Sequence, residues 1–113
     1  MEAKFRNSVY LLGEKGFALM AGSNIVSSGT GSIAIGKEQF VVGKNASSFG
    51  MKNFVRNSTA FACGYNNTVT GLHSAAFNEG NNIMGYASFG CGDHNTIASS
   101  HSFGTGWQNL SSG

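Results

Sequence analysis

The chain has 113 residues, the length of one modest domain, and an unusual composition of 17 Gly, no Pro and only 11% charged residues, where about 25% is typical. Each Gly inside a helix costs about 1 kcal/mol, so the composition disfavours helices. The 41% of hydrophobic residues exclude a disordered chain, and the absence of Pro excludes collagen. The formal charge is +4 over residues 1–56 and −2 over residues 57–113, and without an arginine-rich or RNA-binding motif we expect a solvated basic surface with no nucleic-acid partner.

Residues 1–15 form the first segment, which we interpret as a leader or cap. They carry several charges and lack the uninterrupted apolar core of a signal peptide. No stretch of the chain approaches the 18 consecutive apolar residues of a membrane span. The sequence therefore predicts neither an export signal of its own nor membrane insertion.

Residues 16–113 contain a column of turn residues at every seventh position. Eleven of its fourteen members are Gly. The column consists of Gly22, Gly29, Gly36, Gly43, Gly50, Asn57, Gly64, Gly71, Asn78, Gly85, Gly92, Ser99, Gly106 and Gly113. Two of the three exceptions are Asn, the non-Gly residue that best tolerates positive φ. The column predicts one left-handed turn position that recurs between segments of strand length.

Odd and even segments differ, so the full repeat has fourteen residues. SIAIG at 32–36 represents the odd kind and NTVTG at 67–71 the even kind. Residues 16–113 then form a seven-turn β-roll domain of two short strands per turn, with turns stacked about 4.8 Å apart. The sequence predicts an all-β parallel solenoid. Because the last turn has no polar cap, we expect the natural chain to continue beyond residue 113.

Side-chain alternation predicts the interior of the roll, because positions two apart on a strand share a face. Two residues before the turn, even segments carry Val41, Val55, Val69, Ile83 and Ile97. At the same point, odd segments carry small residues, namely Ala34, Ser48, Ala62, Ala76, Gly90 and Gly104. We expect the two sets to lie opposite each other inside a narrow roll.

The other face of the odd strands carries large apolar residues. The interior is already occupied, so this face is expected to pack on something else, and an apolar patch of this size marks an interaction surface. The sequence predicts a symmetric homotrimer or dimer with the odd strands turned to a common axis. The predicted interface consists of Ile33, Ile35, Phe49, Phe61, Phe77, Phe89 and Phe103. The alternative is a wide, monomeric roll with Phe inside.

The repeat resembles a known family. Its clearest copies are GYNNTVTGLHSAAFN at 64–78 and GCGDHNTIASSHSFGTG at 90–106. They are similar to the head repeats (Hep-Hag type) of trimeric autotransporter adhesins, with motifs SxAxG and NTxxG, over about residues 22–113. The resemblance implies a left-handed parallel β-roll, a homotrimer and a bacterial surface adhesin. Similar repeats occur in bacteriophage tail fibres.

Two features depart from the adhesin pattern. Phe replaces much of the aliphatic inner column, and this chain lacks the adhesin's signal peptide, coiled-coil stalk and membrane anchor. The missing export signal favours a virion tail fibre over the bacterial cell surface. Both interpretations imply a segment of a trimeric fibre.

Catalytic constellations are sparse. The five acidic residues are scattered, without the pair that glycan hydrolysis needs. His73 and His101 share a column two turns apart, about 10 Å, which is too far for one metal ion. Asp93 and His94 are expected to be a solvated pair. The sequence therefore predicts no catalytic residue, no cofactor and no metal site.

The two cysteines, Cys63 and Cys91, also lie two turns apart in one column. This separation exceeds the reach of about 7 Å between the Cα atoms of a disulfide. We expect them to be buried free thiols.

Exposed aromatic residues are the candidates for ligand contact. Tyr65, Tyr86 and Trp107 flank the turn column among Asn and Ser, a composition suited to stacking on sugars, although they could simply cover the edges of the roll. The sequence favours a structural and adhesive segment of a phage tail fibre that contacts host-surface glycans or proteins. The alternatives are the head of a bacterial trimeric adhesin and a glycan hydrolase carried on a fibre, which the missing acid pair disfavours.

Overall fold

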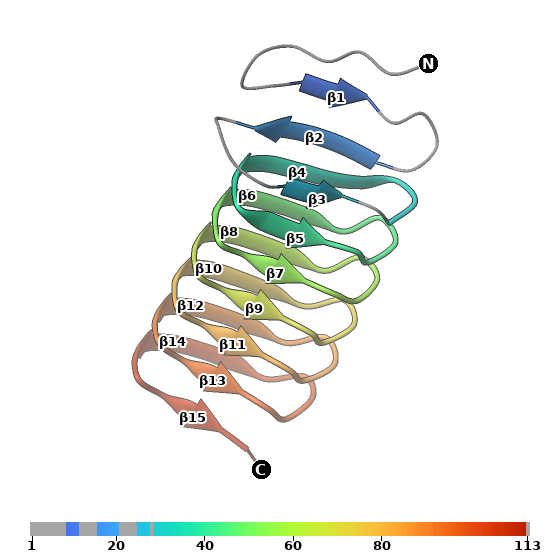
Figure 1. Cartoon of the computed structure of the whole chain (residues 1–113). Coiled ribbons are helices and arrows are strands. Elements are labelled where there is room, and N and C mark those ends of the chain that lie inside the picture. The colour runs from blue at the N-terminus through green and yellow to red at the C-terminus, as the bar shows by residue number, and fades with distance from the viewer. Residues whose placement is uncertain (1–8, 12–15, 21–24, 28, 113) are drawn as a thin grey trace.

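The computed structural model describes residues 9–11, 16–20, 25–27 and 29–112. These residues form a parallel β-solenoid of about six turns with a spacing of about fourteen residues (Figure 1). The solenoid and its spacing are as the sequence predicts, whereas the predicted number of turns is seven. The principal extents are 47 × 23 × 12 Å, and the smallest fits two sheets packed about 10 Å apart. In the part of the chain that the structure describes, no helix is long and apolar enough to cross a membrane.

Two sheets form the walls of the solenoid. The long-strand sheet contains, in spatial order, β1 (Val9–Leu11), β2 (Gly16–Met20), β4 (Ser32–Lys37), β6 (Ser47–Met51), β8 (Phe61–Tyr65), β10 (Ala75–Glu79), β12 (Phe89–Asp93) and β14 (Phe103–Trp107). The short-strand sheet contains β3 (Ile25–Ser27), β5 (Gln39–Val41), β7 (Phe54–Val55), β9 (Thr68–Val69), β11 (Asn82–Ile83), β13 (Thr96–Ile97) and β15 (Leu110–Ser111). Each turn therefore contributes one strand to each sheet.

The register of the long-strand sheet is uniform from β4 to β14. Residues fourteen positions apart pair in parallel, as Ala76 does with Gly90. The step from β2 to β4 is longer, because Gly16 pairs with Ser32. At the N-terminal end, β1 pairs antiparallel with β2 and covers its edge (Figure 1).

The interior matches the predicted columns. The side chains of the predicted apolar column are fully buried, namely Val41, Val55, Val69, Ile83 and Ile97, and so are the small residues of the long-strand sheet that face them. Where Val gives way to Ile, Ala gives way to Gly. A β-carbon at Gly90 would lie 2.3 Å from Cδ1 of Ile83, and one at Gly104 would lie 2.3 Å from Cδ1 of Ile97. The interior therefore keeps a constant volume from turn to turn, as close packing requires.

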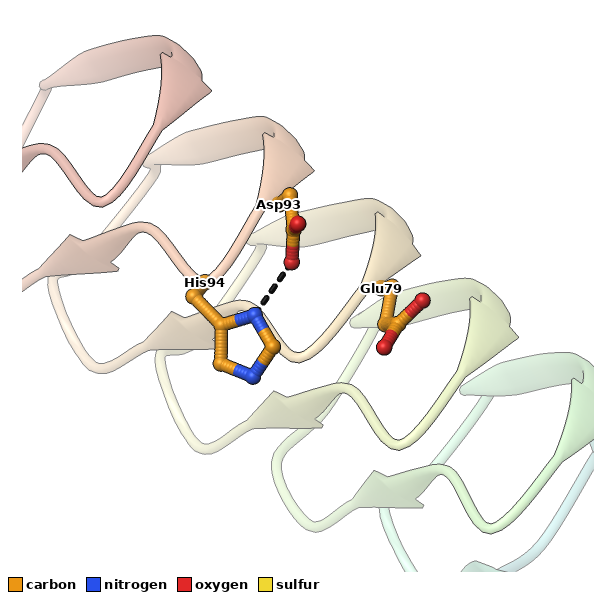
Figure 2. A group of neighbouring side chains, drawn as sticks. All are labelled: Glu79, Asp93 and His94. Atoms are coloured by element: carbon orange, nitrogen blue, oxygen red, sulfur yellow. Dashed lines mark hydrogen bonds and ion pairs between the residues drawn. The ribbon is translucent and has the colours of Figure 1, made fainter.

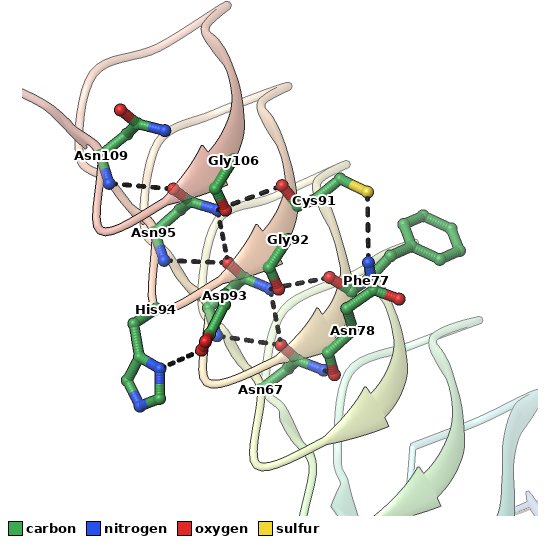
Figure 3. Close-up of polar contacts among 11 residues, drawn as sticks. Asn67, Phe77, Asn78, Cys91, Gly92, Asp93, His94, Asn95, Gly106 and Asn109 are labelled. Atoms are coloured by element: carbon green, nitrogen blue, oxygen red, sulfur yellow. Dashed lines mark hydrogen bonds and ion pairs between the residues drawn. The ribbon is translucent and has the colours of Figure 1, made fainter.

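A ladder of buried asparagines runs along one edge of the interior, where the chain passes from the long-strand to the short-strand sheet. The Asn ladder consists of Asn53, Asn67, Asn81 and Asn95, with Gln39 before it and Asn109 after it. The backbone N–H and the side-chain amide of Asn81 donate to Oδ1 of Asn67 at 3.0 and 3.1 Å. The same amide donates to the carbonyls of Phe77 and Gly92 at 2.7 and 3.0 Å. Asn95 repeats the pattern with the carbonyls of Cys91 and Gly106 (Figure 3).

The Asn ladder satisfies polar groups that have no water available. Its four central side chains are at most 1% exposed, and no described buried side-chain N or O lacks a hydrogen-bond partner. A buried carbonyl without a partner would cost about 1–3 kcal/mol. The amides therefore hold the turns of one edge in register.

Serine side chains make the corresponding hydrogen bonds at the opposite edge, where the chain passes from the short-strand to the long-strand sheet. The hydroxyl of Ser74 accepts the backbone N–H of Ser88 at 3.0 Å and donates to the carbonyl of Gly85 at 2.6 Å. Ser88 repeats the first contact with the N–H of Ser102 at 3.1 Å. The two edges thus use different side chains for the same purpose.

The prediction of one recurring left-handed turn position is wrong for half of the glycine column. Its odd-segment members have positive φ, as at Gly64 (127°) and Asn78 (84°). The even-segment members Gly29, Gly43, Gly71 and Gly85 do not. There Gly is required by close approach, because a β-carbon at Gly71 would lie 2.1 Å from the carbonyl oxygen of Gly85.

Candidate functional site

The outer face of the long-strand sheet carries a continuous line of phenylalanines. The Phe ladder consists of Phe49, Phe61, Phe77, Phe89 and Phe103. Successive ring centroids lie 5.7, 5.3, 5.3 and 5.2 Å apart, which is within the range of favourable aromatic pairs. One face of a solenoid that is only two sheets thick therefore carries a continuous line of neighbouring aromatic rings.

The strand register explains the spacing of the ladder. Phe49 pairs with Cys63, and Cys63 pairs with Phe77, so rings in one column are separated by a small residue. The ring of Phe61, in the neighbouring column, lies between them. Phe89 and Phe103 break this alternation, because they pair directly and stack with an interplanar angle of 5°.

The Phe ladder lies outside the filled interior. Its rings are half-buried in the single chain, except Phe103, which is 67% exposed. Ile33 and Ile35 extend the same face toward the N-terminus and are half-buried as well. The structure thus brings all seven residues of the predicted interface onto one face, and the alternative roll with Phe inside is wrong.

The cysteines lie on this face too. Cys63 and Cys91 are free, as expected, but they are half-buried instead of buried. Cys63 pairs with Phe49 and Phe77, and Cys91 pairs with Phe77 in the same column. Each thiol therefore lies beside rings of the Phe ladder.

The three aromatic candidates for ligand contact do not form one site. Tyr65 and Trp107 end β8 and β14 on the edge next to the Asn ladder and are 39% and 67% exposed. Glu79 and Asp93 occupy the two turns between them. Tyr86 lies in the turn between β11 and β12, at the opposite edge from Tyr65 and Trp107.

Tyr86 belongs to a separate aromatic group. Its ring lies edge-on to His73 and His101, with centroids 5.7 and 5.3 Å away. The two histidines are indeed two turns apart, and the tyrosine ring occupies the space between them. His73 also contacts the hydroxyl of Thr59 through Nδ1.

A cluster of two carboxylates and one imidazole lies on the first edge. Glu79 and Asp93 pair in register at the ends of β10 and β12, and Asp93 contacts Nδ1 of the neighbouring His94 (Figure 2). One ligand atom from each of the three side chains lies within 4.8 Å of the others. The expectation of scattered acids is wrong here, and the fourteen-residue period applied to Glu79 and Asp93 would have revealed their pairing.

Comparison with known protein families, with curated proteins and with solved structures gives no match.

Proposed function

We propose that this chain is a segment of a homotrimeric surface fibre in which three copies turn their Phe ladders to a common axis. The observation that carries the proposal is the position of the Phe ladder outside an interior that is already filled. A free chain would leave this apolar face in water. Three copies around an axis would cover it with identical surfaces, as closed symmetry requires.

A comparison of the two outer faces of the solenoid supports the long-strand sheet as the trimer interface. On the short-strand sheet, Phe40 and Phe54 stack at 4.9 Å, but Thr68 follows them in the same column. Further along, Asn82 and Thr96 continue this column. Only the long-strand sheet carries aromatic rings through successive turns from β6 to β14.

The resemblance of residues 22–113 to the head repeats of trimeric adhesins, which also occur in phage tail fibres, supports the same proposal. We favour the tail fibre, with a left-handed roll as the trimer's building block. The fibre would carry host contact on the edges of the roll, where Tyr65 and Trp107 are exposed. Their aromatic faces and the neighbouring Asn side chains suit a host-surface glycan or protein.

Light scattering during gel filtration tests the assembly. We expect three times the chain mass of 11.8 kDa for the wild type and a monomer for the double variant Phe61→Ser/Phe77→Ser. The matched control is Met84→Ser, because Met84 is 44% exposed and follows β11 of the short-strand sheet. A monomeric wild type at micromolar concentration would rule out the trimer, as would a double variant that stays trimeric.

Oxidation of the native thiols tests which face is used. Cys63 and Cys91 cannot bridge within one chain, because they lie two turns apart. Copper phenanthroline should therefore produce covalent dimers on a non-reducing gel if the long-strand faces meet. The variant Cys63→Ser/Cys91→Ser should give none, and a trimeric wild type without covalent dimers would place the contact elsewhere.

A further inference from the structure

Two successive turns bring three potential metal ligands to one place. The backbone N–H of His94 donates to the carbonyl of Glu79 at 2.9 Å, which fixes the start of one turn against the preceding one. Asp93 pairs in register with Glu79. Both carboxylates and the imidazole therefore project from the same edge, where Figure 2 shows them as neighbours.

The local charge of this cluster favours a cation. Glu79 and Asp93 are the only acidic residues of 57–113, a stretch with no Lys or Arg. Like charges directly opposite each other on adjacent strands are destabilising. Among the described residues, the contact between Asp93 and His94 is the only one between a carboxylate and a nitrogen of Lys, Arg or His, and Glu79 has no such partner. A bound cation would relieve the repulsion between the two carboxylates.

The turn before His94 leaves room for its ring. Position 80 holds Gly, where the neighbouring turns carry Asn66 and His94 itself. A β-carbon at Gly80 would lie 2.9 Å from both Cδ2 and Nε2 of His94. The missing side chain lets the imidazole fold over residue 80, beside Glu79. The absence of a side chain at position 80 is thus a second feature, separate from the charges, that allows the imidazole of His94 to lie near Glu79.

We propose that Glu79, Asp93 and His94 bind a divalent transition-metal ion of the Zn²⁺ class. One imidazole nitrogen with two carboxylate oxygens is a donor set for Zn²⁺, Mn²⁺ or Ni²⁺, whereas Ca²⁺ and Mg²⁺ prefer oxygen ligands alone. Ligands at about 2.0–2.2 Å from one ion lie at most about 4 Å from each other. The donor atoms lie within 4.8 Å, so small rotations of these exposed side chains close the site.

The bound ion would join β10 to β12. Glu79 comes from one turn, and Asp93 and His94 from the next, so the ion adds a cross-link between turns in a region otherwise held by backbone and Asn ladder hydrogen bonds. Three protein ligands leave the remaining coordination positions to water. We therefore expect the ion to raise thermal stability, since it binds only the folded chain.

Isothermal titration with ZnCl₂ after removal of metal by EDTA tests the site, with melting temperature as a second readout. We expect one ion per chain, a raised melting temperature, and at least tenfold weaker binding in Glu79→Gln and in His94→Gln. The matched controls Glu38→Gln and His101→Gln change an exposed acid and an exposed histidine at other turns and should bind like the wild type.

Circular dichroism verifies that each variant keeps its strands, so that lost binding is not lost folding. The proposal is overturned if the wild type binds no Zn²⁺, if Glu79→Gln and His94→Gln bind as tightly as the wild type, or if His101→Gln alone abolishes binding. Equal affinity for MgCl₂ would contradict the role of the imidazole. None of these measurements depends on whether the chain is a trimer.

Discussion

Cδ1 of Ile83 occupies the space that a β-carbon would need at Gly90, because the two would lie only 2.3 Å apart. We expect Gly90→Ala to lower the free energy of unfolding by about 1–3 kcal/mol, the usual cost of overpacking. In Ile83→Val/Gly90→Ala the extra methyl fills the space that Val vacates, so most of the loss should be recovered. Urea unfolding of the two single variants and the double variant measures the coupling, and additive losses would contradict direct contact.

The Asn ladder predicts a large loss for Asn81→Ala. This change removes the hydrogen bonds that the side chain of Asn81 makes with Oδ1 of Asn67, with the carbonyl of Phe77 and with the backbone N–H of Asn95. With about 1–3 kcal/mol for each buried group left unpaired, we expect the free energy of unfolding to fall by at least about 3 kcal/mol. The control Asn82→Ala changes a half-buried neighbour in β11 and should cost less than about 1 kcal/mol. Equal losses in urea unfolding would show that the ladder does not stabilise the fold.

One turn residue should be improvable. Ala87 is exposed and has a φ of 52°, a left-handed conformation that costs a residue with a β-carbon about 1–2 kcal/mol. Gly removes this strain, but its greater freedom in the unfolded chain lowers the free energy of unfolding by about 0.4–1 kcal/mol. The balance is a gain, so Ala87→Gly should raise the free energy of unfolding by about 0.5 kcal/mol. The control Ala75→Gly lies in strand β10 and should destabilise by about 0.5–1 kcal/mol. Thermal unfolding compares the two, and a lower melting temperature for Ala87→Gly would contradict the strain.

The exposed aromatics predict where a host ligand binds. If Tyr65 and Trp107 stack on sugars, the double variant Tyr65→Ala/Trp107→Ala should bind host cells or their glycans about tenfold more weakly, the effect of losing roughly 1.4 kcal/mol. Tyr86→Ala, on the opposite edge, is the control. Unchanged binding of the double variant at unchanged melting temperature would remove both residues from the ligand site.

The solenoid and its interior could be predicted from the sequence because their residues recur in phase. Val69 and Ile83 stand two residues before a column of turn residues, and their small partners Ala76 and Gly90 occupy the matching point of the odd segments. The burial of an apolar column that recurs at a fixed period can be predicted without knowing the geometry of the turns. The position of the Phe ladder followed from the same alternation.

The Asn ladder and the carboxylate–imidazole cluster were harder to predict, since both depend on the path of the turn. Asn67 and Asn81 recur every fourteen residues, but polar residues beside Gly suggest exposed turns. Only the backbone path shows that these amides point inward while His94 points outward. The glycine column failed for a related reason, because close approach of two turns at Gly71 and positive φ at Gly64 select the same residue type.

The contacts of the Asn ladder also bear on how such a chain changes length. Asn67, Asn81 and Asn95 each bond to the residue fourteen positions before them and to carbonyls at fixed offsets. Deleting or duplicating one fourteen-residue block gives every remaining amide an equivalent partner, whereas a seven-residue block would place a long-strand segment against a short-strand one. Gain or loss of whole fourteen-residue turns therefore preserves the contacts of the Asn ladder, whereas gain or loss of half a turn would break them.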